Sequence, residues 1–177
     1  MTIILVVGDS RAGKTTFAHL ACHHQLPVNV FRSTSTETFY LRGNCTVAEL
    51  RVLPGGITDE HLQREAHGAD GVIIMYEKQS TIHSARKWII RLSRLVSGIE
   101  RVPLLICRHK STALSSRHCR RLSELLMRYR TAEHTCTSEE RPVGIVDCVN
   151  RMATRIRRLP PSPLVQRGAS QCSEPDE

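Results

Sequence analysis

One segment near the amino terminus has the residue types and the spacing that bind phosphate. Gly8-Asp9-Ser10-Arg11-Ala12-Gly13-Lys14-Thr15 matches the pattern G-x-x-x-x-G-K-[ST] without a gap. In such a loop the backbone N–H groups surround a β-phosphate, the lysine bridges β- and γ-oxygens, and the last hydroxyl faces Mg²⁺. The pattern predicts a nucleotide site formed by these residues and Thr16, with Lys14 on the phosphates and Thr15 on the metal. The Asp9 side chain is expected to point away and to take no part in the chemistry.

The elements around this loop are those that a phosphate site requires. Thr2–Val7 reads TIILVV, a continuous aliphatic run that favours a strand buried on both faces. Apolar residues at helical spacing then predict a helix over Thr15–His24, which ends before Pro27. The loop therefore lies between a buried strand and the N-terminus of a helix, where the helix dipole stabilises anions.

Strand-like and helix-like segments alternate along the rest of the chain. A hairpin is expected from residues 39–41 and 47–53 around Gly43-Asn44, and Thr58 is a candidate N-cap for a short helix reaching about Ala66. Further strands are expected at 71–76, 102–107 and, more weakly, 132–136, and further helices at 80–96, 115–129 and 143–156. This alternation predicts a P-loop α/β fold, with a mostly parallel six-stranded sheet covered by helices on both faces.

Length and composition limit the class of protein. The chain has 177 residues, which suits one domain, here residues 1–158, followed by a flexible tail, 159–177, rich in Pro, Ser and acidic residues. The 7 cysteines are spaced singly, which favours reduced thiols in the cytoplasm. The apolar runs are too short to span a bilayer, and the end of the sequence is no prenylation box, so no membrane anchor is expected.

Positive charge is concentrated in one region. The formal net charge is +8, and residues 85–130 contain 12 Lys and Arg against 2 acidic residues. Aromatic residues make up only 4%, so platforms for base stacking are scarce and nucleic-acid binding is disfavoured. A solvated face or a face for an acidic partner is the expected use of this charge.

From Met1 to about Arg158 the order of motifs resembles that of a Ras-type small GTPase: a P-loop, an edge hairpin, a glycine break and three further strand–helix units. The resemblance implies binding of GTP or GDP with Mg²⁺. It also implies that Thr34, after Phe31-Arg32-Ser33, closes on the metal and the γ-phosphate, with Thr36 and Thr38 as alternatives, and that Gly56 contacts the γ-phosphate.

The later motifs depart from that pattern. Leu53-Pro54-Gly55-Gly56 stands in place of D-x-x-G, so the aspartate of the metal's water shell is missing, and Ile57 replaces the glutamine that orients the attacking water. His109-Lys110-Ser111-Thr112 stands in place of N-K-x-D, so Lys110 can still pack on the base but Thr112 offers no carboxylate to guanine. Thr137, in Cys136-Thr137-Ser138, corresponds loosely to the last base motif. We therefore expect very slow or absent GTP hydrolysis, no catalytic residue, and relaxed discrimination between guanine and adenine. Restoring Asp at Leu53 and Gln at Ile57 should raise hydrolysis.

These departures look like those of the Rab-like 5 type of small GTPase. That resemblance implies a subunit of the intraflagellar transport B complex, which docks on coiled-coil partners in the cytoplasm and at the cilium or flagellum and its base. Two other hypotheses stay open. A small P-loop nucleoside or nucleotide kinase would use the same loop with an arginine-bearing lid, which Arg117, Arg120 and Arg121 could imitate. A pseudo-GTPase that binds nothing is disfavoured by the intact Lys14 and Thr15.

Overall fold

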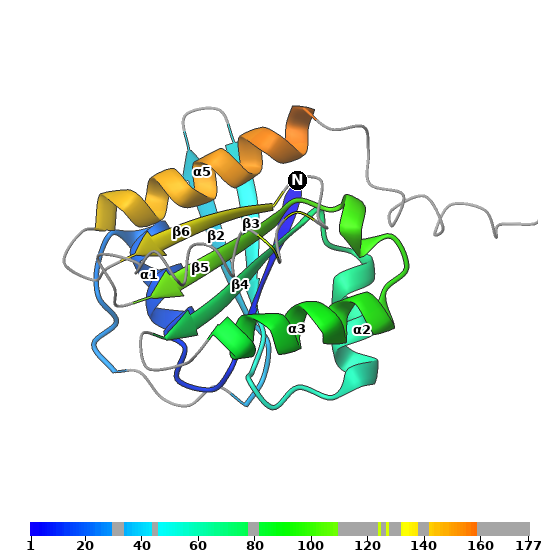
Figure 1. Cartoon of the computed structure of the whole chain (residues 1–177). Helices are drawn as coiled ribbons and strands as arrows, with labels where there is room; N and C mark the ends of the chain where they lie inside the picture. Colours follow the sequence, from blue (N-terminus) through cyan, green and yellow to red (C-terminus); the bar gives the residue numbers. More distant parts are fainter. Residues whose placement is uncertain are drawn as a thin grey trace, which may run out of the picture.

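The chain is described from a computed structural model, which covers residues 1–29, 34–43, 46–77, 82–109, 124, 127, 132–137 and 142–158. Strands and helices alternate along it, as Figure 1 shows. The elements in chain order are β1 (Thr2–Gly8), α1 (Lys14–His23), β2 (Glu37–Gly43), β3 (Thr46–Val52), α2 (Asp59–His67), β4 (Gly71–Glu77), α3 (Ile82–Leu95), a 3₁₀ turn (Ile99–Arg101), β5 (Leu104–His109), β6 (Ala132–Thr137) and α5 (Pro142–Arg158).

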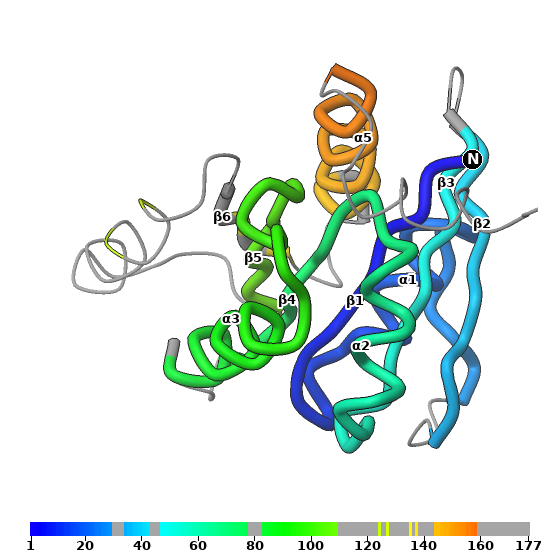
Figure 2. The backbone as a smooth tube through the Cα atoms, turned by 90° about the vertical axis from the view of Figure 1, so that its right-hand side faces the viewer, coloured from blue at the N-terminus to red at the C-terminus, as the bar shows by residue number. Residues whose placement is uncertain are grey.

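The strands form one mixed sheet in the order β2-β3-β1-β4-β5-β6. β3, β1, β4, β5 and β6 run parallel, and β2 joins β3 antiparallel as the outer strand of the expected hairpin. Figure 2 shows β2 and β6 at opposite edges of the sheet. Because parallel neighbours end at the same edge, the loops after β1, β3, β4 and β5 gather at one end of the sheet.

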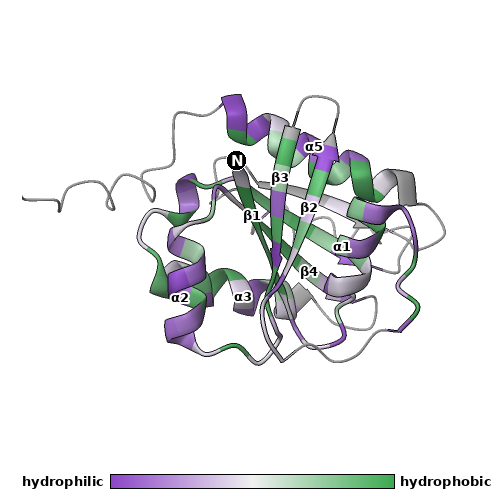
Figure 3. Cartoon of the chain, turned by 180° about the vertical axis from the view of Figure 1, so that it is seen from behind, coloured by the Kyte–Doolittle hydropathy of each residue, from purple (hydrophilic) through white to green (hydrophobic). Residues whose placement is uncertain are grey.

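Successive residues of the central strands face opposite sides of the sheet, and each side carries its own core. Leu5 and Val7 of β1 pack with α2 and α3, whereas Ile4 and Val6 pack with α1 and α5. Figure 1 shows α5 and the pair α2 and α3 on opposite faces, and Figure 3 shows apolar strands between helices with polar outer surfaces. The expected α/β class, with helices on both faces of a mostly parallel sheet, is confirmed.

Most expected elements are present, and their bounds differ where local chemistry intervenes. Thr58 caps α2, since its hydroxyl accepts from the His61 N–H at 3.4 Å. β5 starts later than the expected strand, because a 3₁₀ turn and Pro103 precede it, and it runs on to His109. The expected helix 115–129 lies outside the described residues except for Glu124 and Met127, and the expected tail 159–177 lies wholly outside them. Within the described ranges, no helix has both the length and the apolar character needed to cross a bilayer.

Candidate nucleotide site

The loop between β1 and α1 has the backbone form of an anion cradle. Arg11 and Gly13 adopt the left-handed conformation, with φ of 69° and 80°, and the Ala12 N–H donates to the Asp9 carbonyl at 3.2 Å. Gly13 occupies the N-cap position of α1, and having no side chain it leaves the first-turn N–H groups without a side-chain cap. Such uncapped N–H groups at a helix N-terminus are the donors that bind phosphate. In this loop Gly8 closes β1 beside Met75, Ala12 is buried and Ser10 is exposed.

The Lys14 side chain extends from the start of α1 back to the first residues of this loop. Its side chain is only 7% exposed, and its Nζ donates to the carbonyl oxygens of Gly8 at 2.9 Å and Asp9 at 2.8 Å. Burial lowers the pKa of Lys14 to about 8, and the nearby charges of Asp9 and Glu37 oppose that shift. In the part of the chain that the structure describes, no carboxylate forms an ion pair with this ammonium. Within the described ranges this largely desolvated cation donates to carbonyl oxygens, and the carboxylates of Asp9 and Glu37 act on it only as nearby charges.

His109, the last residue of β5, packs against the loop at Gly13. The side chain is wholly buried, and its Nδ1 lies 3.2 Å from the Thr137 hydroxyl, which is also buried. A Cβ added to Gly13 would lie 2.1 Å from the His109 Cδ2, so the imidazole packs directly on the loop glycine. Thr137 and His109 are paired at the ends of β6 and β5. Among the expected nucleotide residues, these two are brought together beneath the loop, and Lys110 lies outside the described residues.

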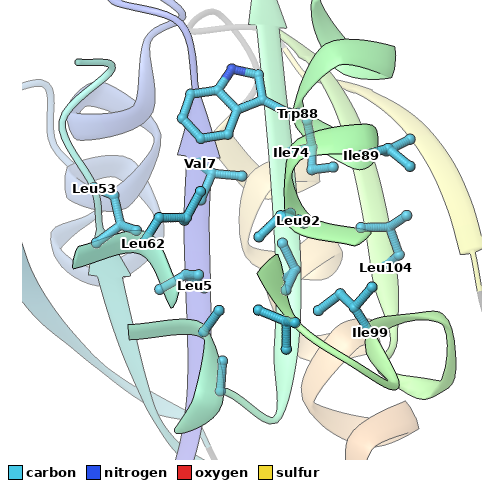
Figure 4. Close-up of a cluster of buried hydrophobic side chains, with 14 of the residues drawn as sticks. Leu5, Val7, Leu53, Leu62, Ile74, Trp88, Ile89, Leu92, Ile99 and Leu104 are labelled. Carbon is cyan, nitrogen blue, oxygen red and sulfur yellow. The ribbon is translucent and has the colours of Figure 1, made fainter. Parts of the chain in front are cut away.

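The side chain of Asp9, for which the sequence indicated no role, fastens the loop to α3. Its carboxylate accepts from the Ser84 hydroxyl and from the Trp88 indole N–H at 2.9 Å. Figure 4 shows Trp88 at one end of the apolar cluster beside Val7, with its nitrogen turned away from the aliphatic side chains. A buried indole needs a partner for its N–H, and the loop provides it.

Arg91 extends this connection to the segment before α2. Its guanidinium lies over the Trp88 ring, 5.2 Å from the centroid, and donates to the Asp59 carboxylate at 2.7 Å and to the Ile57 carbonyl at 2.5 Å. Arg91 belongs to the positively charged region 85–130, for which the sequence predicts a solvated face or a face for an acidic partner. The structure instead places it in a chain of contacts from Asp9 through Trp88 to Ile57.

The segment that replaces D-x-x-G is packed into the core. Leu53 is fully buried and Ile57 is 6% exposed, and both belong to the apolar cluster shared with α2 and α3. Gly55 lies against the phosphate loop, since an added Cβ would be 2.3 Å from the Ser10 nitrogen, whereas Gly56 has open space around it. This segment therefore contacts the loop through its backbone and directs its apolar side chains away from it.

The hydroxyl of Thr15 already has an oxygen neighbour. It donates to the Glu37 carboxylate at 3.0 Å, from the first turn of α1 to the first residue of β2. Thr34 is exposed, while the Thr36 hydroxyl is buried and makes no hydrogen bond within the described ranges. A hydroxyl beside a carboxylate is an oxygen donor set that fits Mg²⁺, which binds through one or two carboxylates together with water and phosphate oxygens. Thr15 and Glu37 are the residues that would hold such an ion, and it would offset phosphate charge there.

Sequence reasoning missed Glu37, Ser84, Trp88 and Arg91 as residues of this region. No pattern in the sequence connects Trp88 with Asp9 or points to Glu37. Across the described residues, three or more His, Cys, Asp or Glu side chains nowhere gather as a metal site. No protein-family model matches the chain, and no curated protein matches it significantly.

Proposed function

We propose that the chain is a nucleotide-binding interaction module that takes GTP or GDP with Mg²⁺ in the loop between β1 and α1. The observation that carries this proposal is the buried Lys14 ammonium, which donates to two backbone carbonyls and forms no ion pair within the described ranges. A desolvated cation at a helix N-terminus is stabilised by an anion, and phosphate groups provide that charge with the geometry the loop N–H groups require.

Binding without appreciable turnover is the second part of the proposal. Leu53 and Ile57 lie in the apolar core, so neither side chain offers an oxygen or nitrogen to a metal-bound water or to an attacking water. The bound nucleotide then acts as a ligand that stabilises one conformation, in the manner of a switch held in one state. Because Thr112 lacks a carboxylate, we expect GTP and ATP to differ in affinity by no more than about tenfold, or about 1.4 kcal/mol.

The use of this state is proposed from the resemblance to Rab-like 5 proteins. Nucleotide would fix the conformation of segments 31–38 and 56–63, and the surface that they form would dock on coiled-coil subunits of the intraflagellar transport B complex at the cilium base. The close contact of Gly55 with Ser10 supports such coupling, because any movement of the loop meets the backbone of the neighbouring segment. If so, Lys14→Ala should weaken capture of that partner as well as nucleotide binding.

The test is to identify nucleotide carried by the purified protein. The wild type, Lys14→Ala and the control Lys87→Ala, which changes an exposed lysine of α3, are purified without added nucleotide, denatured and analysed by chromatography. Binding is then titrated through Trp88, the one tryptophan of the chain, whose indole is bonded to the loop. Guanine nucleotide recovered from the wild type and the control, but not from Lys14→Ala, supports the proposal. No nucleotide and no titratable binding would overturn it, and repeated phosphate transfer to an acceptor nucleoside would favour the kinase.

A further inference from the structure

Leu53 stands where the small GTPases that the chain resembles have the aspartate of the D-x-x-G motif, and its side chain cannot ligate a metal. Leu53 follows β3 directly, its backbone N–H donates to the Val6 carbonyl at 3.0 Å, and its side chain lies in the core between the sheet and α2. A carboxylate needed beside the phosphate loop must therefore come from another strand.

Glu37 lies on the face of the sheet where the loop helix packs. It is paired with Val52 across β2 and β3, and Val52 belongs to the core shared with α1 and α5. Leu53 belongs to the opposite core. The Glu37 carboxylate thus lies on the edge strand β2, one strand further out than Leu53, and on the face of the sheet that carries Thr15.

Packing between β2 and α1 holds Glu37 in this place. Phe39, two residues further along the same face of β2, lies edge-on against His19 with ring centroids 5.0 Å apart, and against His23 at 6.4 Å. Thr15, His19 and His23 follow one another at intervals of four along α1 and so share one face of the helix. The hydrogen bond between Thr15 and Glu37, at 3.0 Å, is the first contact of this series.

We propose that Glu37, together with the Thr15 hydroxyl, ligates the divalent cation of the nucleotide complex in place of the aspartate that is absent at Leu53. The inference rests on the proposed function, since phosphate oxygens and water complete the coordination of Mg²⁺. A residue of the edge strand β2 would then ligate the metal, which the aspartate of a D-x-x-G motif would do after β3. The same carboxylate accepts from the Thr15 hydroxyl and lies close enough to Lys14 to raise the pKa of its ammonium.

The test compares the release of bound GDP in Mg²⁺ and in EDTA. Wild type, Glu37→Gln and Thr15→Val are loaded with GDP that carries a fluorescent group, and its release is followed by the fluorescence of that group after addition of excess unlabelled GDP. Glu100→Gln, which neutralises an exposed carboxylate of the 3₁₀ turn Ile99–Arg101, is the matched control. Glutamine keeps the length of the side chain and an oxygen that can accept from Thr15, so the substitution removes mainly the charge. Water-proton relaxation of the Mn²⁺–GDP complex gives a second measurement that does not depend on release rates.

We expect the wild type and Glu100→Gln to release GDP at least about tenfold faster in EDTA than in Mg²⁺, as loss of about 1.4 kcal/mol of metal-dependent affinity requires. In Glu37→Gln this ratio should fall toward one, with release in EDTA within about twofold of the wild type. Even mutation of a hydrogen-bonding partner of a metal ligand typically costs about 10- to 100-fold in metal affinity, so loss of a ligand should cost at least as much. An unchanged ratio in Glu37→Gln would overturn the assignment of Glu37 alone. Slower release by Glu37→Gln in EDTA would also overturn it, because the carboxylate would then act by repelling phosphate. Failure of the wild type to bind GDP in either buffer would overturn the proposed function and this site with it.

Discussion

The contact between Gly13 and His109 allows a quantitative prediction about what shapes the phosphate loop. Gly13 has φ 80°, and an alanine there incurs about 1–2 kcal/mol for the left-handed backbone. The added Cβ would also lie 2.1 Å from the His109 Cδ2, where ordinary contacts are 3.4–4 Å. Moving a buried imidazole that is bonded to Thr137 is an overpacking cost of about 1–3 kcal/mol. We therefore expect Gly13→Ala to lower the free energy of unfolding by about 2–5 kcal/mol.

His109→Ala removes the clash and leaves only the backbone cost, so the two substitutions should not be additive. In the His109→Ala background, Gly13→Ala should cost about 1–2 kcal/mol, which gives a coupling of about 1–3 kcal/mol. Gly98→Ala is the matched control, because Gly98 has φ 84° with nothing within 4 Å of an added Cβ, and it should cost the backbone term alone in both backgrounds.

The assay is urea unfolding followed by circular dichroism in EDTA without nucleotide, with the slope of each transition compared to confirm two-state behaviour. Substitutions at Gly13 and His109 that add within about 0.5 kcal/mol would refute the packing that we describe. If Gly98→Ala lowered the free energy of unfolding as much as Gly13→Ala, backbone strain alone would account for the effect of the Gly13 substitution.

Three further predictions follow from burial. Leu53→Asp places a carboxylate in a fully buried apolar site, so it should lower the free energy of unfolding by at least about 3 kcal/mol in urea. Contrary to the expectation from the sequence alone, it should therefore not raise hydrolysis, and a stable, active variant would contradict this. Because burial lowers the pKa of Lys14 to about 8, GDP affinity in EDTA should be constant below that pH and fall above it, by at most about tenfold per pH unit, as the ammonium loses its proton. Trp88 fluorescence titrations at each pH measure the GDP affinity. An affinity that stays constant up to about pH 9.5 would exclude Lys14 as the cation that binds the phosphates. Burial raises the pKa of the Cys22 thiol to about 11, so iodoacetamide at about pH 8 should modify Cys22 far more slowly in the native protein than in urea, as peptide mass mapping would show.

The sequence determined the alternation of elements because hydrophobic periodicity and caps act locally. The continuous run TIILVV, the cap at Thr58 and the hairpin before Leu53 each correspond to an element of the structure, within a few residues. The G-x-x-x-x-G-K-[ST] spacing likewise located the loop between β1 and α1, because a glycine with positive φ followed by a helix start is encoded over a few neighbouring residues.

Only the tertiary structure decided how distant residues complete the loop. Asp9 meets Trp88 across 79 positions, and Thr15 meets Glu37 across 22, and neither pairing leaves a pattern in the sequence. The sheet face on which a side chain lies depends on strand register, and register separates Glu37, on the α1 side, from Leu53, in the opposite core. Local sequence therefore encodes the phosphate loop, whereas strand pairing and helix packing determine which side chains support it, because both bring together residues from separate elements.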